Sequence, residues 1–172
     1  STFRRGKVLR QGVPTAIVGR PNVGKSSLLN ALAGYERAIV TDLAGTTRDT
    51  VEEKAVVGGV LLRLIDTAGI RETGDTVERL GVDRAWAAAE AADLSLLVLD
   101  GSEPLAAEDE EAVRASVQAG SQIVLVNKSD LPQAVDLTAL QSRFAHVVPI
   151  SAKEGTGLEA LEAAVMALFP AG

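Results

Sequence analysis

The sequence predicts an α/β fold in which a mostly parallel, six-stranded sheet carries helices on both faces. Apolar runs of strand length alternate with segments of helical periodicity along most of the 172 residues, which is typical of parallel strands joined by crossover helices. One exception is a pair of β-rich runs around Gly58-Gly59, which predicts a single antiparallel hairpin. The third observation is a phosphate-binding spacing, Gly19 to Ser26, between the first strand and the first helix.

Each element follows from its local pattern. The apolar and β-rich runs predict strands at 15–18, 51–57, 60–65, 94–99, 122–126 and 146–150. Helical spacing predicts helices at 26–33, 76–91, 105–119, 136–144 and 158–168, the last of them stopped by Pro170. The polar stretches 34–50 and 66–74 are predicted loops. The acids 108–111 lie near the start of a helix, where they favour its dipole, and we interpret them as a solvated face.

The amino-acid composition excludes several classes of protein for this chain. Hydrophobic residues make up 47% of the chain, enough for one core without covalent staples, and the chain has no cysteine. Disulfides, thiolate metal sites and a cysteine nucleophile are thereby excluded, which suits a reducing compartment, and we expect a cytoplasmic protein. A net charge of -6 argues against general nucleic-acid binding by this domain. No apolar run approaches the ~20 residues that span a membrane.

The chain divides into two predicted parts. Residues 1–12 are locally basic and predict a linker from a neighbouring domain, with a phosphate-contacting arm as the alternative. Residues 13–172 form the predicted nucleotide-binding domain. Because the chain does not begin with Met, we expect it to be a piece of a longer protein.

The spacing from Gly19 to Ser26 predicts a P-loop nucleoside triphosphatase. Its glycines let backbone N–H groups point inward, and the following helix adds its positive end. Lys25 is expected to reach the β- and γ-phosphates, and the Ser26 hydroxyl to bind Mg²⁺. The predicted phosphate-binding residues are Asn22, Val23, Gly24, Lys25, Ser26 and Ser27.

Two loops predict contacts to Mg²⁺ and the terminal phosphate. Asp66 follows an apolar strand and can hold Mg²⁺ through water, while the Gly69 N–H can bond the γ-phosphate. Thr47, in the long first loop, is the predicted second protein ligand of Mg²⁺, ordered only while the γ-phosphate is present.

Polar residues after the last two strands predict a guanine site. The Asp130 carboxylate can accept from guanine N1–H and from the exocyclic amine, a pair that adenine lacks. The Ala152 N–H can donate to guanine O6, and the Lys128 stem can cover the base. The predicted guanine-binding residues are Asn127, Lys128, Asp130, Ser151, Ala152 and Lys153.

With these motifs, residues 14–170 resemble Ras-like GTPase domains of the translation-factor class. The resemblance is strongest to the MnmE (TrmE) family of bacterial tRNA-modification GTPases. It rests on residues 19–30, 39–49 and 66–72, and residues 77–86 narrow it to that family. The family implies GTP hydrolysis within an enzyme system that, with the FAD-dependent partner MnmG, modifies the wobble uridine of tRNA. The modification chemistry itself is expected in domains that this chain lacks.

The resemblance also implies how water is activated. Ile70 stands where Ras-like enzymes carry a water-orienting Gln, and in this family a glutamate matching Glu78 takes that role, with Lys25 and Gly69 completing the catalytic set. Arg48 and Arg71 are not expected to act as arginine fingers. Instead the family implies K⁺, which a transient dimer of the GTPase domains encloses. The implied K⁺ ligands are Asn22, Thr41, Leu43 and Thr46.

Two alternatives stay open at this point. A ribosome-assembly GTPase domain shares the general motifs. A nucleotide-binding switch with negligible turnover, acting through partner binding, is consistent with Ile70.

Overall fold

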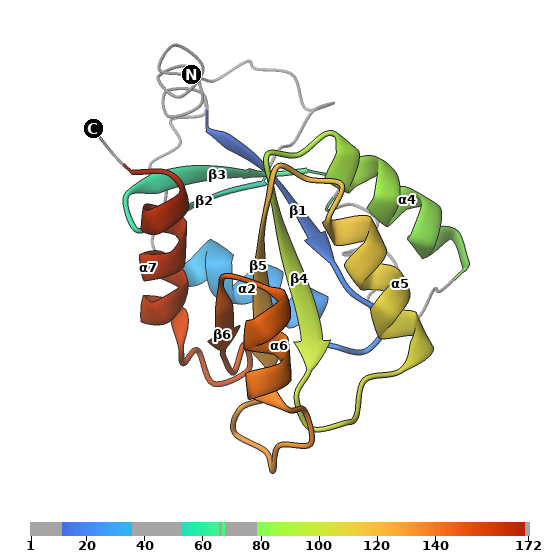
Figure 1. Cartoon of the computed structure of the whole chain (residues 1–172). Coiled ribbons are helices and arrows are strands. Elements are labelled where there is room, and N and C mark those ends of the chain that lie inside the picture. The colour runs from blue at the N-terminus through green and yellow to red at the C-terminus, as the bar shows by residue number, and fades with distance from the viewer. Residues whose placement is uncertain (1–11, 36–52, 66, 68–78, 171–172) are drawn as a thin grey trace.

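A computed structural model of the chain describes residues 12–35, 53–65, 67 and 79–170. Figure 1 shows a central sheet with helices on both sides. The strands are β1 (Val13–Val18), β2 (Glu53–Val57), β3 (Val60–Leu64), β4 (Leu94–Asp100), β5 (Ser121–Asn127) and β6 (Val147–Pro149). The helices are α2 (Lys25–Tyr35), α4 (Arg79–Glu90), α5 (Ala107–Ser116), α6 (Leu137–Arg143) and α7 (Leu158–Leu168).

The six strands lie in the order β2-β3-β1-β4-β5-β6. Only β2 and β3 pair antiparallel, and all other neighbours are parallel. The predicted hairpin is confirmed: Gly58 and Gly59 have φ of 60° and 78°, the left-handed conformations that a tight two-residue turn requires. Every residue of β4 is buried, as expected for a central parallel strand covered on both faces.

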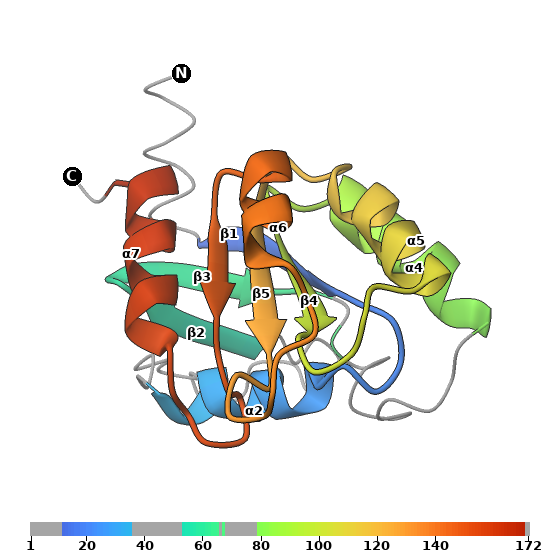
Figure 2. The same ribbon diagram turned by 60° about the horizontal axis from the view of Figure 1, so that its bottom comes forward.

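Two hydrophobic layers hold the helices to the sheet. Helices α2 and α7 pack on one face, around Leu28, Leu29 and Leu161. Helices α4, α5 and α6 cover the other face, where Ala89, Ala112 and Leu140 contribute to the second layer. Figure 2 shows the arrowheads of β4, β5 and β6 pointing toward the same edge of the sheet. That edge is where ligands bind in sheets of this kind.

Helix boundaries differ from those predicted. Helix α2 runs to Tyr35 rather than residue 33, and α5 ends at Ser116 rather than residue 119. The carbonyl of Ser116 accepts hydrogen bonds from the Ser95 hydroxyl at 2.9 Å and from the Gln122 amide at 3.3 Å. These tertiary contacts satisfy a carbonyl at the end of α5. Within the described ranges, no helix is both long enough and apolar enough to cross a membrane.

Candidate nucleotide-binding site

The phosphate loop connects β1 to α2. Asn22 and Gly24 have φ of 70° and 105°, so the loop turns through conformations that L side chains rarely adopt. A Cβ on Gly24 would lie 2.1 Å from Nδ2 of Asn127, and therefore both backbone conformation and space demand glycine here. The Leu28 N–H donates to the Gly24 carbonyl at 2.9 Å, which starts the helix at the end of the loop. The N-terminus of α2 is thus placed to attract an anion.

Lys25 and Ser26 occupy the first turn of α2 and are both partly buried. The Lys25 ammonium donates to the Gly19 carbonyl, so its side chain folds back across the loop. Gly19 is itself packed closely, because a Cβ there would lie 2.7 Å from the carbonyl oxygen of Val98 in β4. The loop is consequently fixed between its own lysine and the central strand.

Asn127 joins three of the predicted segments. Its side chain is buried at the end of β5, where Nδ2 donates to the Val23 carbonyl at 2.8 Å. Its Oδ1 accepts from the Ala152 N–H at 2.9 Å. One amide therefore connects the phosphate loop, the end of β5 and the segment after β6.

Asp130 and Ser151 form a second link within the predicted guanine site. The buried Ser151 hydroxyl donates to Oδ1 of Asp130 at 2.9 Å and accepts from the Glu154 N–H at 3.1 Å. Asp130 itself is exposed. A hydrogen bond to one oxygen thus orients a carboxylate that stays at the surface.

Residues 127–130, at the end of β5, form the base loop, and Lys128 extends from it toward the phosphate loop. Its φ is 67°, and its ammonium donates to the Asn22 carbonyl at 3.2 Å and to Oδ2 of Asp100 at 2.9 Å. Burial alone raises the pKa of Asp100, but hydrogen bonds from Ser102 and Lys128 outweigh it, so the pKa lies below its ordinary value. Sequence reasoning missed Asp100, although an aspartate that ends a fully buried and mostly apolar strand was a usable signal.

Arg20 shows that one prediction was wrong at Asp109, whereas Glu108 and Glu111 are exposed as predicted. The acids 108–111 were expected to form a solvated face, but Asp109 is 2% exposed and accepts from Arg20 Nε at 3.0 and 3.1 Å. Nη2 of Arg20 donates to Glu103 at 2.8 Å. Burial acts to lower the pKa of Arg20, yet the hydrogen bonds and charges of Glu103 and Asp109 raise it overall. Arg20 therefore stays charged and is held by two acids.

The other predicted residues are placed as follows. Ser27 is exposed in the first turn of α2, and Lys153 is exposed next to buried Ala152. Among the residues that the structure describes, no three or more His, Cys, Asp or Glu side chains are grouped to hold a metal ion. The predicted residues that lie outside the described ranges are Thr41, Leu43, Thr46, Thr47, Asp66, Gly69 and Glu78.

This sheet, with a P-loop and polar segments gathered at its carboxyl edge, is the fold of a GTP-hydrolysing domain of the Ras-like class. Residues 14–128 match the family described as 50S ribosome-binding GTPase, and the chain belongs to that family.

Proteins similar to this chain carry a more specific name. The tRNA modification GTPase MnmE of Bacillus thuringiensis (strain Al Hakam) is 55% identical over 170 residues, covering 98% of this chain and 37% of the relative. The protein of the same name from Exiguobacterium sibiricum is also 55% identical, over 175 residues, with the same two coverages. The chain thus spans little more than a third of the length of these relatives.

A solved structure of similar fold is that of Era with MgGDPNP and nucleotides 1506–1542 of 16S ribosomal RNA. Its TM-score is 0.64 and its sequence identity is 27%, over 93% of this chain and 57% of that one.

Proposed function

We propose that this domain hydrolyses GTP with Mg²⁺ and K⁺, and that its nucleotide cycle switches a longer protein that modifies the wobble uridine of tRNA. The 55% identity to proteins named tRNA modification GTPase MnmE supports the second part. Because this chain covers 37% of those relatives, we assign it the nucleotide cycle alone. The MnmG partner, tRNA and a cytoplasmic location belong to the proposal for the whole protein.

The observation that carries the guanine-nucleotide site is the pair of hydrogen bonds made by Asn127. They connect the phosphate loop at Val23 to Ala152 after β6, and Ser151 orients Asp130 beside them. In this site the Asp130 carboxylate accepts from guanine N1–H and the amine, while the Ala152 N–H turns to guanine O6 when the base enters. Lys128 and Lys153 flank the base.

Both cations fit the donor types present. Hard cations prefer oxygen ligands, and the described donors are the Ser26 hydroxyl in α2 and the exposed Asn22 amide, whose side chain carries an oxygen. Thr47 and, through water, Asp66 would complete the Mg²⁺ site with Ser26. Thr41, Leu43 and Thr46 would complete the K⁺ site with Asn22. When bound, the cations supply positive charge that offsets charge developing on the phosphates.

The protein's own groups have distinct roles in the proposed hydrolysis. The Lys25 ammonium exchanges the Gly19 carbonyl for phosphate oxygens, and the Gly69 N–H donates to the γ-phosphate. Glu78 orients the attacking water, because the side chain of Ile70 cannot hydrogen-bond. Pairing of two GTPase domains across the first loop would exclude bulk water from the site.

Turnover of GTP in KCl and in NaCl, over a range of protein concentrations, tests the proposal. We expect faster turnover in KCl, with a rate per molecule that rises with protein concentration because the active form is a dimer. Equal rates in both salts at every concentration would contradict the K⁺ and dimer parts of the proposal. If ATP were hydrolysed as fast as GTP, the proposed guanine site would be contradicted.

Two alternative functions keep some support. The description 50S ribosome-binding GTPase and the likeness to Era support a ribosome-assembly GTPase. Ile70 supports a switch that acts by binding a partner and turns over little GTP. Single-turnover measurements separate the second alternative, since a pure switch binds GTP but leaves it intact in both salts. Measuring tRNA modification and ribosome assembly in cells that lack the whole protein separates the first.

A further inference from the structure

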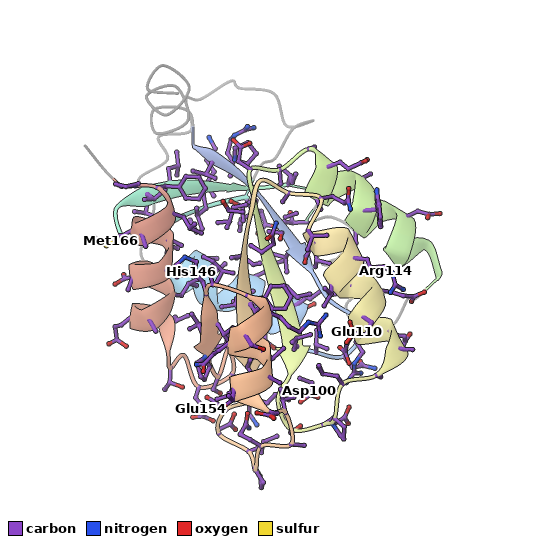
Figure 3. The ribbon with its side chains drawn as sticks, viewed as in Figure 1. Asp100, Glu110, Arg114, His146, Glu154 and Met166 are labelled. Carbon is purple, nitrogen blue, oxygen red and sulfur yellow. The ribbon has the colours of Figure 1, made fainter. Side chains whose placement is uncertain are left out.

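The connection between β4 and α5 contacts both nucleotide loops. Asp100 ends β4 and binds Lys128 of the base loop, while Asp109 lies in the first turn of α5 and binds Arg20 of the phosphate loop. Figure 3 labels Asp100 near the end of β4 and Glu110 on α5. Neither aspartate belongs to the motifs that predicted the site.

Asp109 holds Arg20 in one orientation. The Asp109 side chain is 2% exposed and that of Arg20 is 14% exposed, so this ion pair lies largely out of water. Nε of Arg20 contacts both carboxylate oxygens, and the Ala106 N–H adds a bond of 2.7 Å to Oδ2. Arg20 follows Gly19, whose carbonyl accepts from the Lys25 ammonium. Fixing Arg20 therefore fixes the start of the phosphate loop.

Asp100 holds Lys128 in a similar way. Its Oδ1 accepts from the Ser102 N–H at 2.9 Å and from the Ser102 hydroxyl at 2.6 Å, which leaves Oδ2 for the Lys128 ammonium. The next residue, Gly101, donates its N–H to the Asn127 carbonyl at 2.9 Å. Both the side chain and the backbone of the base loop are thereby tied to the end of β4.

Stability alone is a weak reason for such pairs. A buried ion pair often contributes no more than the apolar side chains that could replace it, because both charges lose their water. The next acid of α5, Glu110, pairs with Arg143 at 2.9 Å, but both side chains are about two-fifths exposed (42% and 41%) and neither contacts a nucleotide loop in the described bonds. Helix α5 thus offers a pair of the same chemistry that serves as a control.

We propose that Asp100 and Asp109 are positioning residues for the guanine nucleotide, each holding one of the two loops on the β4–α5 connection. The proposal rests on the proposed guanine-nucleotide site. It assigns Asp109 to the phosphates, through Arg20, and Asp100 to the base, through Lys128. A substitution that weakens binding of only the base or only the phosphates then indicates a positioning role, whereas a general loss of stability would weaken binding of both.

Dissociation constants of GDP and IDP, measured for wild type, Asp100→Asn, Asp109→Asn and Glu110→Gln, test this assignment. IDP lacks the exocyclic amine that would donate a hydrogen bond to the Asp130 carboxylate. We expect each aspartate variant to bind GDP about tenfold more weakly, the loss that follows from one charged hydrogen bond. The preference for GDP over IDP should fall only in Asp100→Asn, and Glu110→Gln should match wild type.

Each outcome separates the two levels of the proposal. Wild type that binds no GDP would refute the proposed function. Wild type that binds GDP, with both aspartate variants within about twofold of it, would refute the positioning roles alone. An equal loss in Glu110→Gln, or an unchanged GDP preference in Asp100→Asn, would also overturn the assignment.

The paired replacement Arg20→Met with Asp109→Leu tests whether that ion pair is merely structural. It removes both charges, and we expect near-normal thermal stability with GDP affinity still reduced about tenfold. Recovery of wild-type affinity together with stability would show that the pair only supports the fold. If this double variant does not fold, the GDP affinity of Arg20→Lys decides whether the pair positions the loop or only supports the fold. Lysine keeps the positive charge but loses the contact with both carboxylate oxygens of Asp109.

Discussion

The side-chain amide of Asn127 donates to the carbonyl of Val23 at 2.8 Å, across 104 positions of sequence. This bond sets the distance between the phosphate loop and the end of β5. A buried side-chain amide that loses its hydrogen-bond partner costs free energy, so this bond favours keeping the two segments together. Any side chain that enters the space between them should disturb both halves of the site.

Gly24→Ala introduces a Cβ where Asn127 Nδ2 would be 2.1 Å away. The φ of 105° adds backbone strain, and we expect loss of GDP binding together with lower stability. Gly59→Ala is the matched control, because its φ is 78° and no atom lies within 4 Å of the added Cβ. The control should cost about 1 kcal/mol of unfolding free energy and leave GDP binding intact. Comparable binding losses in both variants would argue against the role of this contact.

Asp130→Asn should exchange the base preference from guanine to xanthine. The carboxylate matches the donors of guanine N1 and the amine, whereas an amide offers a donor to the second carbonyl of xanthine. Ser151 can still contact the new side chain, which retains one oxygen. Competition of GTP and XTP for the variant measures the exchange, and Asp136→Asn at the N-cap of α6 is the control, because asparagine also caps helices well. Unchanged GTP affinity would place the base elsewhere.

Much of the fold followed from local patterns. The structure confirmed the predicted sheet, hairpin and helices. These elements could be predicted because each depends on the pattern of residues close together in sequence, such as apolar runs and the Gly58-Gly59 turn. The residues 127–130 and 151–153 were also brought together as predicted, since both follow neighbouring parallel strands.

What the patterns could not predict depends on distant partners. Arg20 and Asp109 are 89 positions apart, and an acid in the first turn of a helix looks the same whether water or an arginine faces it. The end of α5 was placed three residues too late, and there too a distant group is involved, because the Ser95 hydroxyl donates to the Ser116 carbonyl. Such pairings become visible only when the sheet brings the segments together.

Glu78→Ala should lower the turnover of GTP by about a hundredfold or more, the order of effect expected for a side chain that acts directly on the attacking water. GDP binding should stay close to wild type, because this residue is assigned to water rather than to the nucleotide. Glu90→Ala, which removes an exposed acid at the end of α4, is the control. Single-turnover hydrolysis and fluorescent-GDP binding measure the two effects separately. Full turnover in the variant would contradict the role of Glu78 in hydrolysis.

The ion pair of Asp100 with Lys128 should make stability depend on pH in the acid range. The pKa of Asp100 is lower in the folded chain than its ordinary value of about 3.9, so folding favours the charged form. Its contribution is therefore complete above the unfolded pKa and is lost as pH falls through the lower folded pKa. We expect wild type to exceed Asp100→Asn in free energy of unfolding at pH 6, with the gap narrowing below about pH 4.

Urea unfolding of both proteins from pH 6 to pH 2.5 measures this gap, and Glu110→Gln is the comparison. The pKa of Glu110 is also lowered, chiefly by its hydrogen bond to Arg143, so the direction of its pH dependence is the same. That pair is exposed to solvent and screened, and its contribution should be much smaller than that of Asp100. A gap for Asp100→Asn that stays constant down to pH 2.5 would show that the charge of the carboxylate is not what holds Lys128.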